Sequence, residues 1–143
     1  MIRDFVAADV ESVRKLLSRS SEAIQWSADD LLQASRRNVN LRVAEEAGAV
    51  CGLIAFRIAA DEAEILNLAV DSAHRRRGIA SRLIENAIGA CKAAGAKKIF
   101  LEVRDSNEAA RNLYARMAFS EAGRRRGYYR RPLEDALVLV RKV

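Results

Sequence analysis

The chain is poor in the residues on which several common kinds of site depend, since its 143 residues include one histidine, two cysteines and one proline. Cys51 and Cys91 lie far apart, and neither has a second cysteine or a histidine at the spacing of metal ligands. We therefore expect no metal site, and we interpret both thiols as small buried side chains. The single histidine, His74, excludes most catalytic machinery that is built on histidine.

Long apolar runs are also missing from the sequence. No stretch approaches the ~18 apolar residues that cross a membrane, and the first residues, Met1 to Phe5, lack the apolar core of a secretion signal. We therefore expect no membrane partner and a cytoplasmic location. Because domains typically hold about 100–150 residues, the length predicts a single domain over residues 1–143.

Positive charge is in excess, with 25 Lys and Arg against 19 Asp and Glu, a formal charge of +6. The sign favours an anionic ligand or a nucleic acid but does not choose between them. Part of the excess lies in the segment Arg75-Arg76-Arg77-Gly78, between an apolar run that ends at Val70 and an amphipathic helical pattern. A strand, a basic turn with glycine and a helix present backbone N–H groups at the positive end of a helix dipole. This turn therefore predicts a phosphate site.

The spacing of apolar residues predicts the element order βααβββαβαββ. Asp9 is the expected cap of the first helix, and Ser27 with Asp30 resembles a capping box that starts a second helix reaching about Arg37. The segment from Ile65 to Arg104 should form a right-handed parallel crossover. The other expected elements are strands at 1–6, 41–46, 50–59, 63–70, 98–104, 119–125 and 135–140, and helices at 78–94 and 107–117. This order is typical of an α/β fold with a mixed sheet and helices on both faces.

The basic turn resembles the signature of the GCN5-related N-acetyltransferases (GNAT), which is Arg or Gln, two variable residues, Gly, one variable residue, and Gly or Ala. Arg75, Gly78 and Ala80 fill these positions. Other segments are similar to RimI-type ribosomal protein N-terminal acetyltransferases, namely residues 65–71, 101–104 with 106–107, 112–114, 128–129 and 134–136. Family members commonly have Pro where Ser72 or Ala73 stands and Gly where Ala118 stands.

The resemblance implies a GNAT fold, with a mostly antiparallel central sheet of about seven strands around a parallel β-α-β cofactor-binding core. It also implies acetyl-CoA as co-substrate and a protein N-terminus, of a ribosomal protein, as acceptor. Leu68, Ala69 and Val70 resemble the strand segment whose backbone pairs with the pantetheine arm. The expected contacts to the pyrophosphate are Arg75, Arg76, Arg77, Gly78, Ile79, Ala80 and Ser81, and Asn107 resembles the family residue that hydrogen-bonds coenzyme A.

Two residues are candidates for proton transfer. Glu102 lies on a strand whose Ile99, Leu101 and Val103 take the opposite face, and it matches a family motif, so we assign it as general base. Tyr114 follows Asn107 by seven residues on one helix face, with Arg111 between them. Because the apolar stripe of that helix is expected elsewhere, at Ala110, Leu113 and Met117, we assign Tyr114 as the acid for the coenzyme thiolate.

A second basic run, Arg124 to Arg131, contains Tyr128 and Tyr129. The resemblance implies that these tyrosines line the slot for the peptide N-terminus, while structural packing and RNA contact are alternatives. Asn67 interrupts an apolar run, and it either faces the cleft or satisfies a neighbouring strand.

The function that these residues predict is direct acetyl transfer to a protein N-terminus in a ternary complex. One alternative is a GNAT enzyme that acetylates a lysine side chain or a small amine. A second alternative is a catalytically silent module that binds coenzyme A or RNA, although nucleic acid is the less favoured ligand.

Overall fold

The computed structural model describes residues 1–75 and 78–143 and contains a seven-stranded sheet with the order β1-β2-β3-β4-β5-β7-β6. Neighbouring strands are antiparallel except for β4 and β5, which are parallel. The strands are β1 (Ile2–Asp4), β2 (Asn40–Glu46), β3 (Ala49–Ala59), β4 (Glu62–Val70), β5 (Lys98–Arg104), β6 (Ser120–Tyr129) and β7 (Glu134–Lys142). The predicted mixed, mostly antiparallel sheet is confirmed.

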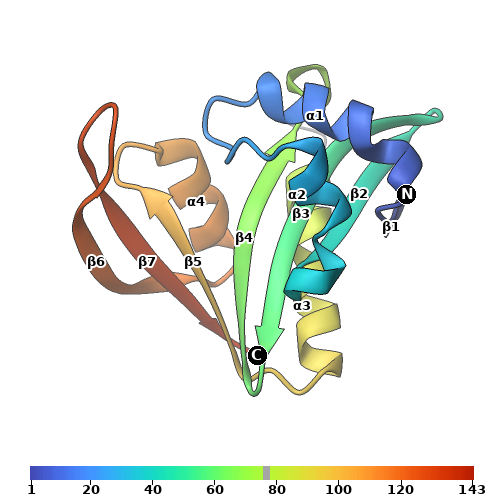
Figure 1. Cartoon of the computed structure of the whole chain (residues 1–143). Helices are drawn as coiled ribbons and strands as arrows, with labels where there is room; N and C mark the ends of the chain where they lie inside the picture. Colours follow the sequence, from blue (N-terminus) through green and yellow to red (C-terminus); the bar gives the residue numbers. More distant parts are fainter. Residues whose placement is uncertain (76–77) are drawn as a thin grey trace.

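Helices cover both faces of this sheet (Figure 1). The α-helices are α1 (Val10–Ser18), α2 (Ala28–Leu32), α3 (Ile79–Ala93) and α4 (Glu108–Arg116), and short 3-10 turns are η1 (Ala7–Asp9), η2 (Ser35–Arg37) and η3 (Ser72–His74). In the part of the chain that the structure describes, no helix is long and apolar enough to cross a membrane.

Each face of the sheet has its own hydrophobic core. Ile54 and Phe56 of β3 belong to the core beneath α3 and α4, whereas Leu53 and Ala55 belong to the core beneath α1 and α2. This division follows from the alternation of side chains along a strand. Cys51 and Cys91 are fully buried in the first core, as the sequence predicts, and burial raises the pKa of both thiols.

Local sequence signals fix several boundaries. β2 and β3 are joined by Ala47 and Gly48, with φ of 51° and 79°, which is the conformation of a type I′ hairpin turn. The Ser27 hydroxyl accepts from the Asp30 N–H at 3.1 Å, and Asp30 accepts from the Ser27 N–H at 2.9 Å, so the predicted capping box is confirmed. Helix α2 nevertheless ends at Leu32 rather than near Arg37, because η2 replaces its last turns.

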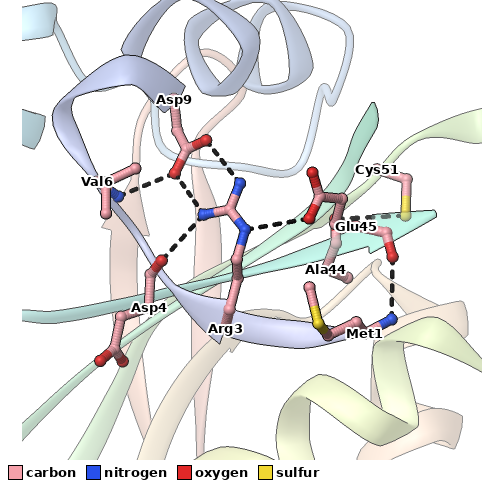
Figure 2. Close-up of polar contacts among 8 residues, drawn as sticks. All are labelled: Met1, Arg3, Asp4, Val6, Asp9, Ala44, Glu45 and Cys51. Carbon is pink, nitrogen blue, oxygen red and sulfur yellow. Dashed lines mark hydrogen bonds and ion pairs between the residues drawn. The ribbon is translucent and has the colours of Figure 1, made fainter. Parts of the chain in front are cut away.

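Asp9 is the N-cap residue of α1, as predicted, but its side chain makes no hydrogen bond to the first turn of that helix among the described residues (Figure 2). Its carboxylate accepts two hydrogen bonds from the Arg3 guanidinium, both at 2.8 Å, and one from the Val6 N–H at 2.9 Å. The side chain therefore closes the 3-10 turn η1 and ties it to strand β1. The ion pair with Arg3 outcompetes the expected bond to the first turn of the helix.

The two parallel strands separate soon after they meet. β4 and β5 pair only over residues 62–64 and 98–100, and they diverge towards their carboxyl ends (Figure 1). In β4 a bulge lies at Leu66, because Ile65 is opposite Phe56 while Asn67 is opposite Ala55. The extra residue inverts the alternation of side chains, so Ile65 faces the core beneath α3 while Asn67 lies on the side of α1 and α2. The sheet is thus opened at its centre.

Candidate active site

Two cavities meet where β4 and β5 separate. The inner cavity, of about 140 Å³, lies between the strands and contains residues 65–68 of β4 and 101–104 of β5 in its lining. The outer cavity, of about 400 Å³, lies on the side of α1 and α2. Both share Glu102, and the other residues common to their linings are Ile24, Ile65, Leu66 and Tyr129. A molecule in one cavity can therefore reach a molecule in the other beside Glu102.

Glu102 is placed at this junction by the alternation of β5. Leu101 and Val103 are buried in the core beneath α3, so Glu102 points to the opposite face, as predicted. Its side chain is 19% exposed, and its Oε1 lies 2.9 Å from Nε of Arg125. The carboxylate thus combines partial burial with access to both cavities, as a base acting on a bound amine requires.

Tyr114 also lines the inner cavity, but it does not lie off the apolar stripe as predicted. It is the buried residue of α4, it packs edge to face on Phe119 with ring centroids 5.4 Å apart, and Leu113 and Met117 are only partly buried. Burial raises the pKa of the Tyr114 hydroxyl far above its usual value. The side chain therefore serves both packing and the cavity, and its hydroxyl keeps its proton.

The side chains of Asn107 and Arg111, at the start of α4, have different surroundings. Asn107 is the N-cap, accepts from the Ala110 N–H at 3.1 Å and lines the inner cavity with Tyr114. Arg111 instead donates to the Asp105 carbonyl at 2.9 Å and is absent from the described lining of that cavity. The helix face that the sequence predicts for Asn107, Arg111 and Tyr114 therefore does not bring Arg111 into the described lining of this cavity.

Tyr128 and Tyr129 both line the outer cavity. Strand β6 continues through both residues instead of ending near Arg125, which fixes the rings 5.2 Å apart in an edge-to-face pair. Arg104 stacks on the Tyr129 ring at 4.3 Å, and the pKa of Tyr129 is raised chiefly by burial. The pKa of Tyr128 is raised chiefly by the negative charge of Glu102, and both residues line the outer cavity.

The basic turn leads into α3 with a left-handed residue. Gly78 has φ of +74° and is the N-cap of α3, which carries no side-chain cap among the described residues. The N–H groups of the first helical turn have no partner within a helix, so those of Ile79, Ala80 and Ser81 point out of its end. The Ile79 side chain is buried, which leaves only its backbone for a ligand. Arg76 and Arg77 lie outside the described residues.

Strand β4 offers one edge of its backbone beyond its short pairing with β5. Leu68, Ala69 and Val70 pair with β3 on one side, whereas pairing with β5 has ended at Glu64 in the described part of the sheet. Leu68 lines the inner cavity, and the Ala69 side chain is buried in the core beneath α1. An extended ligand can therefore lie along this edge from the inner cavity towards the turn at Gly78, with backbone groups as partners.

Sequence reasoning missed the roles of Ile24 and Arg125 at the junction and left two roles open for Asn67. Ile24, in the connection between α1 and α2, lines both cavities, and Asn67 holds its backbone with two hydrogen bonds. Arg125 reaches Glu102 from β6, across the intervening strand β7. Asn67 gave a signal as the one polar residue in an apolar run. It lines the inner cavity, as one of the two alternatives expects, and its side chain bonds to the loop at Ile24 rather than to a neighbouring strand.

The arrangement brings a carboxylate and a phenol to opposite faces of an opened sheet. Glu102 lies on the side of α1 and α2, and Tyr114 belongs to the core beneath α3 and α4, yet both line the inner cavity. A group held between the strands can lose a proton to the carboxylate on one side and gain one from the phenol on the other. The junction therefore fits transfer of a group from a donor that lies along β4 to an amine in the outer cavity.

Known proteins match this chain over nearly its whole length. The Acetyltransferase (GNAT) family matches residues 10–119. The [ribosomal protein bS18]-alanine N-acetyltransferase of Haemophilus ducreyi is 32% identical, with 97% of each chain covered.

Two solved structures have the same fold. The crystal structure of the ribosomal-protein-S18-alanine N-acetyltransferase from Escherichia coli has a TM-score of 0.90 and 28% identity, covering 100% of this chain and 93% of its own. The structure of Ard1 from Thermoplasma volcanium has a TM-score of 0.89 and 28% identity, covering 100% and 97%. With the family match and the 32% identical relative, the chain belongs to the GNAT acetyltransferase family.

Proposed function

We propose that this enzyme transfers an acetyl group from acetyl-CoA to the N-terminal amine of a protein, and that the protein is ribosomal. The junction of the two cavities at Glu102 carries the proposal, because it lets a donor and an acceptor meet beside a base. Names of relatives that act on ribosomal protein bS18 support the choice of acceptor. Such a substrate requires a cytoplasmic location, and we propose that residues 1–143 act as a single domain.

The residues present fit a coenzyme A molecule. The edge of β4 at Leu68, Ala69 and Val70 suits the amides of the pantetheine arm, since β5 does not pair with it in the described part of the sheet. The start of α3 has left-handed Gly78 and no side-chain cap from a described residue, so it suits the diphosphate. Contacts from Arg75, Ile79, Ala80, Ser81 and Asn107 complete the proposed site. When bound, acetyl-CoA supplies an acetyl group activated as a thioester.

Glu102 acts as the base in this scheme. A peptide α-amino group has a pKa near 7.7–8.0, so at neutral pH only a weak base is needed to take its proton. Tyr128 and Tyr129 line the acceptor side of Glu102 and hold the first residue of the peptide through their rings and hydroxyls. Proton loss to Glu102, directly or through a water, leaves the amine able to attack.

Tyr114 acts as the acid. Its hydroxyl stays protonated because burial raises its pKa, so it can donate to the sulfur as the thiolate leaves. Backbone N–H groups of β4 around the bulge at Leu66 are the proposed donors to the carbonyl oxygen. Both cysteines are buried away from the junction in the core, so transfer is direct and passes through no acyl-cysteine.

Mass spectrometry of peptides after incubation with acetyl-CoA tests the function. A peptide with a free N-terminal alanine and an acetylated lysine side chain should gain one acetyl group. Its matched partner, with a blocked N-terminus and a free lysine, should gain none. Acetylation of the second peptide alone would assign a lysine or small-amine acetyltransferase instead. Release of no thiol with either peptide, together with binding of coenzyme A, would assign a silent binding module.

A further inference from the structure

Asn67 joins β4 to the connection between α1 and α2 through both halves of its side-chain amide. Its Oδ1 accepts from the Ile24 N–H at 3.1 Å, and its Nδ2 donates to the Ile24 carbonyl at 2.9 Å. Asn67 is only 5% exposed. The side-chain amide therefore bonds to the Ile24 backbone as the backbone of a neighbouring strand would. It fixes Ile24, which belongs to neither a helix nor a strand.

This pairing depends on the bulge of β4. The inverted alternation after Leu66 turns Asn67 towards α1 and α2, where its neighbour Ala69 is buried among apolar side chains. An amide costs free energy in such a place unless all its polar atoms are bonded. Ile24 satisfies the amide on both sides, so the fold uses this buried polar group to hold one loop residue.

Ile24 is held where the two cavities meet. Its side chain lines the inner and the outer cavity together with Glu102 and Tyr129, although Ile24 is 54% exposed. An apolar side chain left this exposed at the entrance of a site gains burial when a ligand covers it. In the outer cavity, that ligand is the part of the acceptor next to the reacting amine.

We propose that Asn67 is a positioning residue for the acceptor. It holds Ile24 as the apolar wall for the first side chain of the substrate, and it fixes this wall to the strand that binds the acetyl donor. This inference rests on the proposed transfer to a peptide N-terminus. It predicts that loss of the two hydrogen bonds weakens peptide binding while acetyl-CoA binding and the proton transfers are kept.

We expect the loop to stay folded without Asn67, because Gln25 attaches it independently. The Gln25 amide donates to the Leu17 carbonyl at 2.6 Å at the end of α1. Asn67→Leu therefore removes both bonds to Ile24 at similar volume and leaves this second attachment. Ser20→Ala is the matched control, since Ser20 is also a buried polar residue of this region but donates to the Leu16 carbonyl.

The experiment measures kcat and KM for a peptide with N-terminal alanine, and the dissociation constant of acetyl-CoA by calorimetry. For Asn67→Leu we expect KM to rise about tenfold, with kcat within about twofold and unchanged acetyl-CoA affinity. Hydrogen exchange at the Ile24 amide should accelerate. Ser20→Ala should keep the wild-type KM. A wild-type KM in folded Asn67→Leu refutes the positioning role.

Ile24→Ala keeps the test valid if Asn67→Leu does not fold, because Ile24 is exposed. It should raise KM by a similar factor and shift kcat/KM towards peptides that begin with leucine by about tenfold. Where Asn67→Leu folds, the double variant Asn67→Leu/Ile24→Ala should raise KM no more than Ile24→Ala alone. Additive increases in KM would show that Asn67 does not act through Ile24. A wild-type enzyme that acetylates no peptide N-terminus would refute the proposed function and the peptide contact together.

Discussion

The Nε atom of Arg125 lies 2.9 Å from Oε1 of Glu102, so the proposed base is held by a guanidinium that reaches it across a whole strand. The Arg125 side chain is 59% exposed and the Glu102 side chain 19%. Arg125 also lies over the Tyr128 ring at 5.6 Å. The ion pair therefore orients the carboxylate from the solvent side.

Arg125→Gln should lower kcat/KM by about two- to fivefold, because exposed ion pairs contribute little more than 1 kcal/mol. Since solvent screens such pairs, the difference from wild type should shrink as salt rises. Arg126→Gln is the matched control, because Arg126 is an exposed neighbour on the same strand. An equal loss in both variants would mean that overall positive charge, and not the contact with Glu102, is responsible.

Glu102→Gln should lower acetylation about 100-fold at pH 7, the usual effect of losing a general base. The deficit should shrink as pH rises past about 8, because the peptide amine then loses its proton without help. Rates from pH 6 to 10 check this. Glu85→Gln, on an exposed position of α3, should keep the wild-type profile. A constant deficit across this range would remove Glu102 from proton transfer.

Tyr114→Phe should lower kcat at least tenfold while the acetyl-CoA dissociation constant stays nearly constant, since only the hydroxyl is lost and the ring can keep its contact with Phe119. The raised pKa of Tyr114 also predicts that wild-type activity does not fall through loss of this proton near pH 10. Thermal unfolding of the variant should match wild type. Full activity of Tyr114→Phe would leave the residue with packing alone.

The position of Glu102 could be predicted because it follows from local alternation. Ile99, Leu101 and Val103 are apolar at every second position, which leaves one direction for the residues between them. The same reasoning was wrong for Tyr114. Only a narrow face of α4 contacts the core, and Tyr114 both packs in that core and lines the cavity. The helical period alone therefore did not identify Tyr114 as the buried side chain.

The contacts of Asn67 could not be predicted from sequence. Ile24 is 43 positions away, and the direction of the Asn67 side chain depends on the bulge at Leu66. When both faces of a strand are buried, its sequence is apolar throughout and shows no alternation, so a bulge cannot be recognised from the sequence pattern. The reach of Arg125 to Glu102 likewise depends on the final strand order, in which β7 lies between β5 and β6.

Gly78→Ala should weaken acetyl-CoA binding and lower stability by about 1–2 kcal/mol, because alanine is strained at positive φ. Among residues 1–75 and 78–143, no neighbouring atom lies within 4 Å of a Cβ added at Gly78, so the expected cost comes from the backbone. Gly89→Ala is the matched control in the middle of α3, where an added Cβ is also free of contacts. It should raise stability by about 0.5–1 kcal/mol with unchanged acetyl-CoA affinity. Calorimetry measures acetyl-CoA binding and thermal unfolding measures stability in both variants. Together they distinguish an effect of the proposed phosphate turn from a general effect of a substitution in α3.

Asp9→Asn should lower the free energy of unfolding by about 2 kcal/mol at pH 7, because it removes a charge-assisted pair with Arg3. The hydrogen bonds from Arg3 hold the pKa of Asp9 below its usual value (Figure 2). This contribution is complete above the unfolded pKa of about 3.9 and is lost as pH falls through the lower folded pKa.

Denaturant unfolding from pH 2 to 8 measures whether the contribution of Asp9 to stability is lost as pH falls. The difference between wild type and Asp9→Asn should stay constant from pH 5 to 8 and shrink below about pH 4. Glu11→Gln is the control, since the Glu11 side chain is 65% exposed in its pair with Arg14 and should contribute little at any pH. A difference for Asp9→Asn that persists at pH 2 would assign the effect to contacts of the uncharged side chain, and not to the charge shared with Arg3.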